Sequence, residues 1–197
     1  MIKYAAIDIG SNAVRLLLSE VRGEGDGLMV KKISWIRMPI RLGADAFLDG
    51  RISWERAEKL EKTIRGFRHL IQAYGPKDFM ACATSAMRSA ENGAKVCAGI
   101  SVRTGIDIEI IDGQTEAHYL FQNRHEIMTA GKKAVMFIDV GGGSTEITFF
   151  SKGRVVASRS FNIGTIRLLN DRVKDKEWTD MQKWVERSAA PYPGVEA

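Results

Sequence analysis

The stretch that decides the fold is Ile138-Asp139-Val140-Gly141-Gly142-Gly143-Ser144-Thr145-Glu146-Ile147, and an earlier copy runs Ile7-Asp8-Ile9-Gly10-Ser11-Asn12-Ala13-Val14-Arg15-Leu16. Each copy begins as an apolar strand, reaches one aspartate, turns through glycine and small polar residues, and continues as a second strand. Glycine permits positive φ angles and leaves backbone N–H groups uncovered, so such a hairpin tip suits a phosphate oxygen. One Asp-x-Gly after a strand indicates an ordinary turn. Two copies in the same register favour a duplicated fold with one phosphate loop in each half.

The segments that follow the two hairpins repeat as well. The first half predicts three strands and then alternating helices and strands, over residues 3–9, 13–22, 28–37, 53–75, 79–83, 90–104, 107–111 and 116–128. Ser53 is the expected N-cap of the first helix, and Gly75-Pro76 ends it. The apolar face of this helix is expected to comprise Leu60, Ile64, Phe67, Leu70 and Ile71. After a polar link at 129–133, the second half predicts strands over 134–140, 144–151 and 154–161 and short helices over 165–170 and 177–187. We therefore expect a complete first domain over residues 1–130 and a partial second domain over residues 131–197.

The composition is that of an ordinary globular protein. The chain has 197 residues, of which 45% are apolar and 27% are charged, enough to bury a sizeable core. The formal charge of +5 suits an anionic ligand, but the lysines and arginines are scattered, which does not favour a nucleic-acid surface. Cys82 and Cys97 lack metal-ligand spacing, so we expect buried thiols in a reducing compartment. Because no apolar run could span a bilayer and the first residues already form a strand, we expect a cytoplasmic protein with no signal peptide and no membrane partner.

The order of elements resembles that of the actin, hexokinase and heat-shock-chaperone ATPase superfamily, whose fold is a duplicated ribonuclease-H-like unit. Within it, the residues resemble the exopolyphosphatase and guanosine pentaphosphate phosphohydrolase family. Beside the two hairpins, the segments that carry the resemblance are Arg41-Leu42-Gly43, Ala83-Thr84-Ser85-Ala86-Met87-Arg88-Ser89-Ala90 and Ile111-Asp112-Gly113-Gln114-Thr115-Glu116-Ala117. The resemblance implies an α/β, ribonuclease-H-like (actin-like ATPase) fold, with a complete first βββαβαβα domain and the start of a second.

The resemblance also implies roles for four acidic residues. Glu116 matches the family's catalytic glutamate, which is expected to orient and deprotonate the attacking water, although the residue alone also fits a carboxylate that stabilises a helix start. Asp139 and Glu146 match the acidic pair around a divalent metal, with Asp8 contributing from the first hairpin, and Mg²⁺ is the expected cofactor. From the residues alone, Glu146 lies on the polar face of its strand, where a surface carboxylate is an equally good interpretation.

The expected phosphate-binding residues come from both hairpins and from one arginine. Arg88 matches a family arginine near the phosphates, although an arginine at a helix start is usually only solvated. Arg15 and Arg41 are weaker candidates of the same kind. The expected loop residues are Gly10, Ser11 and Asn12 in the first hairpin and Gly141, Gly142, Gly143, Ser144 and Thr145 in the second.

The end of the chain departs from the family pattern. The sequence after Trp184-Val185-Glu186-Arg187 does not resemble the family's continuation, and a later Gly-Gly-Asn segment is absent. We expect the incomplete second domain to leave apolar side chains uncovered, so that the chain self-associates, for example as a homodimer. These side chains are Phe137, Phe149, Phe150 and Phe161.

The leading functional interpretation is a metal-dependent phosphoanhydride hydrolase. It would release terminal phosphate from inorganic polyphosphate or from guanosine pentaphosphate, and the sequence does not decide between these two substrates. One alternative is a non-catalytic fragment or regulatory module that binds phosphate or polyphosphate. Another is an ATP-dependent kinase or actin-like ATPase, which the absence of the adenosine-site segment disfavours.

Overall fold

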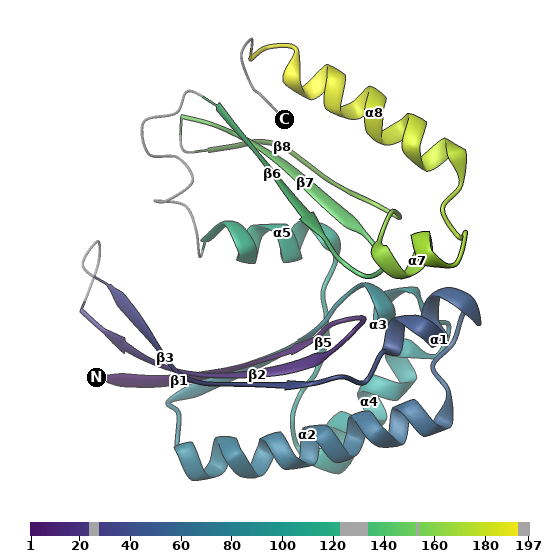
Figure 1. Ribbon diagram of the computed structural model, residues 1–197. Helices are drawn as coiled ribbons and strands as arrows, with labels where there is room; N and C mark the ends of the chain where they lie inside the picture. The colour runs from purple at the N-terminus through teal and green to yellow at the C-terminus, as the bar shows by residue number, and fades with distance from the viewer. Residues whose placement is uncertain (24–27, 123–133, 153, 193–197) are drawn as a thin grey trace. The chain divides into compact units, whose positions relative to one another are not determined.

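The computed structural model describes residues 1–23, 28–122, 134–152 and 154–192. The chain divides into two compact units, Met1–Ile111 and Asp112–Ala197 (Figure 1). The sequence placed this boundary near residue 130. The difference arises because helix α5 (Gly113–Gln122) packs on strands of the second unit.

The first unit is built on a five-stranded sheet with the order β3-β2-β1-β4-β5. Its strands are β1 (Ile2–Ile9), β2 (Val14–Arg22), β3 (Met29–Met38), β4 (Asp78–Ala83) and β5 (Glu109–Ile110). Its helices are α1 (Leu42–Leu48), α2 (Trp54–Tyr74), α3 (Ser85–Ser89) and α4 (Gly93–Thr104). β1, β2 and β3 form the predicted antiparallel meander, whereas β4 pairs parallel with both β1 and β5. Parallel neighbours need crossover connections, and α2 and α4 supply them along one face of the sheet (Figure 1).

Helix α2 forms for the predicted reasons. The Ser53 hydroxyl accepts a hydrogen bond from the Arg56 amide at 3.3 Å, and the helix ends at Gly75 in the left-handed conformation. Its buried face contains four of the five expected apolar residues, with Thr63 as an addition. The prediction for Leu70 is wrong, because that side chain lies at the margin of the apolar stripe and is 41% exposed.

Helix α4 begins later than predicted, and a glycine explains where. A Cβ atom on Gly93 would lie 1.9 Å from the carbonyl oxygen of Met87, so only glycine allows α3 and α4 to approach so closely. The predicted helix over 90–104 is therefore a turn followed by Gly93–Thr104. The short helix α1 was not predicted.

The second unit contains a three-stranded antiparallel sheet with the order β6-β7-β8. Its elements are α5, β6 (Ala134–Val140), β7 (Thr145–Ser151), β8 (Arg154–Phe161), α7 (Thr165–Leu169) and α8 (Asp175–Ala189). Helices α5 and α8 lie on opposite faces of this sheet (Figure 1). α5 begins three residues before the predicted start, and the predicted continuation over 123–128 lies outside the described residues.

The core of the second unit lies between its sheet and α8. Trp184 of α8 packs on Phe149 and Phe161, with ring centroids 5.8 and 5.6 Å apart, and Ile147 and Ile163 complete the cluster. The expectation of uncovered phenylalanines is therefore wrong for Phe149 and Phe161, which are 0% and 3% exposed.

The two remaining phenylalanines are also not open edges. Phe150 is 1% exposed, and Phe137 is partly buried. Uncovered phenylalanines therefore no longer support the predicted self-association. None of the described helices is both long and apolar enough to cross a membrane.

Candidate functional site

The tip of the first hairpin is a closed turn, and three of its carbonyl oxygens, those of Ser11, Asn12 and Ala13, accept hydrogen bonds. The Gly10 amide donates to the Ala13 carbonyl at 3.1 Å. The carbonyl of Ser11 accepts from the Gly43 amide at 2.7 Å, and that of Asn12 from the Arg41 amide at 3.0 Å. The loop after β3 thus holds the tip from behind through backbone groups.

The tip of the second hairpin repeats this arrangement. The Gly141 amide donates to the Ser144 carbonyl at 2.8 Å, as Gly10 does to Ala13. The carbonyls of Gly141 and Gly142 accept from the amides of Thr165 and Ile166 at 3.0 and 2.9 Å. Here the loop after β8 holds the tip, in the same way as the loop after β3 in the first unit.

Two further residues of the second unit fit closely behind its tip. A Cβ atom on Gly164 would lie 2.5 Å from the backbone of both Gly142 and Gly143, so only glycine fits there. The Arg167 Nε donates to the Gly143 carbonyl at 2.8 Å. Burial lowers the pKa of this guanidinium, and the charge of Glu177 acts in the opposite direction. A cationic group therefore lies directly behind the second tip.

Both tips offer amide N–H groups to a ligand. The amides of Ser11, Asn12 and Ala13, and those of Gly142, Gly143 and Ser144, donate in none of the hydrogen bonds between described residues. Successive N–H groups of this kind, with their carbonyls turned to the protein, form the concave nests that bind phosphate oxygens. Five of the predicted loop residues thus offer open amides that suit an anion, whereas the amides of Gly10 and Gly141 are used within the turns. Thr145 differs, because its hydroxyl donates to the Ile163 carbonyl at 2.5 Å.

Asp8 and Arg15 form an ion pair next to the first tip. They face each other across β1 and β2, and Arg15 Nη1 lies 2.7 Å from Asp8 Oδ2. Both side chains are about half-exposed, so the pair is weak and exchangeable. Arg15 Nε is buried and has no hydrogen-bond partner among the described residues.

Asp139 and Glu146 are directly opposite each other in the β6–β7 ladder. Opposite residues of an antiparallel pair share a face, with Cβ atoms roughly 4.5–5.5 Å apart. Glu146 is only 3% exposed and accepts a hydrogen bond from the Ser160 hydroxyl at 2.8 Å. No lysine, arginine or histidine of the described segments forms an ion pair with either carboxylate.

This carboxylate pair fits a divalent cation. Burying a carboxylate beside another one is unfavourable unless a cation or a proton offsets the charge. Mg²⁺ commonly takes one or two carboxylates and completes its shell with waters and substrate phosphates. Within the described part of the chain, no three His, Cys, Asp or Glu side chains come close enough to form a fuller protein cage. Asp139 and Glu146 therefore fit a metal that shares its shell with a phosphate ligand.

Glu116 lies in the first turn of α5, which packs beside Glu146. The Asp112 carboxylate caps this turn by accepting from the Thr115 amide at 2.7 Å. A Cβ on Gly113 would lie 2.8 Å from the Ser160 Cβ and 3.8 Å from Glu146 Oε1, so the helix start contacts β7 and β8. One carboxylate oxygen of Glu116, Oε2, is buried. The second unit alone thus carries the catalytic candidate, two metal candidates and one phosphate loop.

Arg88 and Ser85 link α3 to its surroundings in the first unit. Arg88 Nη1 donates to the Ile111 carbonyl at 2.5 Å, beyond the end of β5. The Ser85 hydroxyl lies 2.8 Å from the Ser11 hydroxyl. Ser85, which was not predicted, therefore contacts the tip, while the role of Arg88 stays a prediction.

Several residues around the tips were not predicted as functional: Ser85, Ser160, Gly164 and Arg167, and the backbone of Arg41 and Gly43. Arg41 and Gly43 stood in a recognised motif, but their contribution through backbone amides leaves no chemical signature in the sequence. The position of Gly164 could have been recognised from the repeat. It follows the third strand of the second unit, as the segment around Gly43 follows the third strand of the first.

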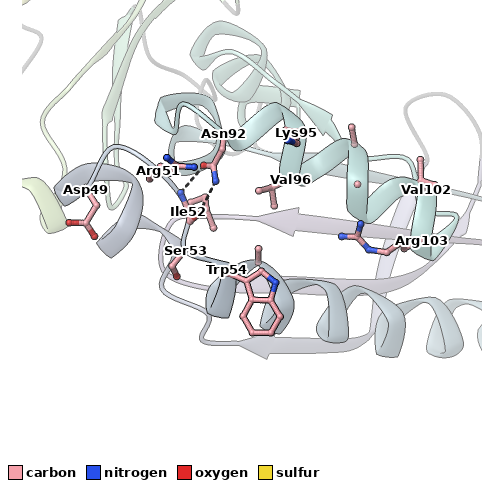
Figure 2. Close-up of a pocket in the computed structure, with 13 residues that line it drawn as sticks. Asp49, Arg51, Ile52, Ser53, Trp54, Asn92, Lys95, Val96, Val102 and Arg103 are labelled. Atoms are coloured by element: carbon pink, nitrogen blue, oxygen red, sulfur yellow. Dashed lines mark hydrogen bonds between the residues drawn. The ribbon is translucent and has the colours of Figure 1, made fainter.

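The first unit also has a surface cavity that does not involve its tip. Its volume is about 930 Å³, and Figure 2 shows that it lies between the start of α2 and the exposed side of α4. The Asn92 side chain donates to and accepts from the Ile52 backbone, with both distances 2.8 Å. No residue of the hairpin tip lines this cavity. It is therefore separate from the phosphate loop.

The sequence has relatives among phosphatases. A model described as the Ppx/GppA phosphatase family matches residues 21–191. The bifunctional 3-dehydroquinate synthase/phosphatase of Fusobacterium nucleatum subsp. nucleatum is 30% identical over 192 residues, 88% of this chain and 29% of that protein. Exopolyphosphatase 1 of Mycobacterium tuberculosis is 29% identical over 175 residues, 88% of this chain and 49% of that protein. The chain spans less than half the length of these two curated relatives.

Solved structures share the fold. The Aquifex aeolicus member of the Ppx/GppA protein family matches with a TM-score of 0.74 and 25% identity, over 96% of this chain and 62% of that chain. A Bacteroides thetaiotaomicron protein with an actin-like ATPase fold and unknown function matches with a TM-score of 0.54 and 8% identity, over 95% of this chain and 77% of that chain. The second likeness concerns the fold alone. Together they confirm the expected actin-like α/β fold.

Proposed function

Because the chain belongs to the Ppx/GppA phosphatase family, we propose that it carries the phosphate-binding part of a metal-dependent phosphoanhydride hydrolase that acts on inorganic polyphosphate. The observation that carries the proposal is the repeated tip geometry, with three open amides in each hairpin and tip carbonyls that accept hydrogen bonds from the loop behind. Exopolyphosphatase 1 of Mycobacterium tuberculosis, a relative over 88% of this chain, supports polyphosphate as the substrate class.

Each site residue then has a defined role. The open amides bind non-bridging oxygens of the phosphate chain, and Glu116 orients a water and takes its proton as the water attacks the terminal phosphorus. The bond between the terminal phosphorus and its bridging oxygen breaks, which releases phosphate and leaves a chain one unit shorter. Mg²⁺ held by Asp139 and Glu146 would neutralise charge on the phosphate oxygens, and Asp8 is the metal candidate of the first unit.

The same chemistry at the end of the substrate extends the proposal to guanosine pentaphosphate. Removal of its 5′-terminal phosphate breaks the same kind of bond, and the tips bind only phosphate oxygens. A groove that distinguishes a nucleoside from a long phosphate chain would lie further along the substrate. A homodimer is a separate proposal that the uncovered phenylalanines no longer support, and sedimentation of the purified chain over a range of concentrations tests it.

The first experiment measures phosphate release from medium-chain polyphosphate with Mg²⁺. Wild type is compared with Glu116→Gln and with Glu55→Gln, a matched first-turn glutamate of α2 in the first unit. Loss of a positioned base should lower the rate by about 10²–10⁴-fold in Glu116→Gln only. Equal rates in all three proteins would remove Glu116 from the mechanism. A wild type that binds tripolyphosphate but releases no phosphate would indicate the non-catalytic binding module instead.

A further inference from the structure

The loop behind the first tip contains a backbone conformation that needs support. Arg41 has a φ angle of 60°, in the left-handed region that residues other than glycine, asparagine and aspartate rarely adopt. Its amide is the donor that holds the Asn12 carbonyl, and two residues later the Gly43 amide holds the Ser11 carbonyl. The conformation of Arg41 therefore aims both donors at the tip.

One side chain fixes this conformation from the other side. Arg56 Nη1 donates to the carbonyls of Ile40 and Arg41, at 2.9 and 2.7 Å. Hydrogen bonds on the carbonyls before and after the Arg41 φ angle, together with the one on its amide, hold both of its flanking peptide planes. Because a residue keeps an unfavourable φ only where its surroundings over-determine it, Arg56 is the group that maintains the loop.

A buried carboxylate in turn orients Arg56. Asp45 is 7% exposed, and its Oδ1 lies 2.5 Å from Arg56 Nε. Its Oδ2 accepts from the Ser53 amide at 2.9 Å. Asn92 anchors the neighbouring Ile52 by two hydrogen bonds, as Figure 2 shows, so the segment that carries the Ser53 donor is itself fixed to α4.

We propose that Arg56, held by Asp45, is a positioning residue that shapes the first phosphate loop through the left-handed backbone of Arg41. The guanidinium is required because its planar fork binds the carboxylate through Nε and the two carbonyls through Nη1 at once. The ammonium of a lysine, a single point of charge, cannot span both. Arg56 touches neither the tip nor a ligand on it, and acts only through the loop. The proposal rests on the proposed function in one respect: the loop it shapes is taken to bind phosphate.

The test measures the loop in the free protein as well as with a ligand. Amide hydrogen exchange of Gly10, Arg41 and Gly43, all of which donate to tip or loop carbonyls, is followed by NMR in wild type, Arg56→Met and Arg56→Lys. Binding of Mg²⁺-tripolyphosphate is measured by calorimetry on the same proteins. We expect faster exchange at Arg41 and Gly43 in both variants, and a dissociation constant raised about tenfold in Arg56→Met, the loss of roughly one charge-assisted hydrogen bond.

Arg65→Met is the matched control. Arg65 lies on the same helix, is paired with Glu61 at 2.7 Å, and is remote from the loop. It should change neither exchange at Arg41 and Gly43 nor tripolyphosphate binding. If Arg56→Met behaves like this control in both measurements, the proposal is overturned.

A rescue separates positioning from general destabilisation. Glycine adopts a left-handed φ without support, so Arg56→Met should weaken tripolyphosphate binding less in the Arg41→Gly background than in wild type. An equal loss in both backgrounds would show that Arg56 does not act through Arg41. If wild type fails to bind tripolyphosphate, the proposed function falls, and hydrogen exchange alone decides whether Arg56 holds the loop.

Discussion

Single residues decide the shape of the second tip, and Gly164 offers the sharpest test. Its φ of −144° and ψ of 159° are open to any residue, so only space restricts this position. Alanine would place its Cβ 2.5 Å from the Gly142 and Gly143 backbone. We expect Gly164→Ala to lower the free energy of unfolding by about 1–3 kcal/mol, as overpacking does, and to weaken tripolyphosphate binding.

The chain contains a matched control for this substitution. A Cβ on Gly66, within α2, would meet nothing within 4 Å. Gly66→Ala should therefore raise the free energy of unfolding by roughly 0.5–1 kcal/mol, because alanine is the better helix former. Urea denaturation of both variants beside wild type measures the two opposite effects. Loss of stability in both variants, or in neither, would contradict the steric explanation.

At the residue scale, the sequence predicted which residues are polar and which way they point better than it predicted which groups they contact. Alternation along β7 correctly assigned Glu146 to the polar face, yet it could not show that the start of α5 covers that face. Asp8 and Arg15 were each singled out, but their ion pair depends on the register of β1 and β2. Patterns in one strand show which way a side chain points. What it meets there comes from segments distant in the chain.

Among the elements, α8 makes a testable contribution to stability through one buried side chain. Trp184 is 8% exposed and packs on Phe149 and Phe161 in the core of the second unit. Truncating a buried tryptophan removes apolar contact and leaves a cavity, so Trp184→Ala should cost about 3–5 kcal/mol. Trp178→Ala on the same helix is the control, because that side chain is 42% exposed and should cost far less. Denaturation of the two variants measures the difference, and similar midpoints would mean that α8 does not cover the sheet in solution.

The succession of strands and most helices along the chain could be predicted, because alternation, caps and glycine stops are local signals. Two elements show where this approach fails. Helix α1 has too few turns to display a period, and its N-cap is a left-handed arginine rather than a usual capping residue. The role of α8 was missed because its polar sequence indicates a helix but does not show which surface it covers. The phenylalanines then looked uncovered only because their partner, Trp184, had not been identified.

At the scale of the whole molecule, the proposed metal should appear in the folding equilibrium. A cation that binds only the folded chain stabilises it, by about 2.7 kcal/mol when its concentration is a hundred times the dissociation constant. Mg²⁺ should therefore raise the urea midpoint of wild type, and a chelator should reverse the increase. Salt effects are controlled by matching the ionic strength with NaCl.

The variant Glu146→Gln tests the metal site, because its expected effect on stability differs without and with Mg²⁺. Without Mg²⁺ the substitution removes repulsion between two facing carboxylates, one of them 3% exposed, so it should leave the chain as stable as wild type or more stable. With Mg²⁺ it should lose most of the increase in midpoint, because one of the two metal ligands is gone. Glu177→Gln, in the same unit, should keep the full increase. If Glu146 were only structural, its substitution would lower stability equally with and without Mg²⁺. A substitution that is harmless without Mg²⁺ but removes the stabilisation by Mg²⁺ therefore requires a cation between these strands.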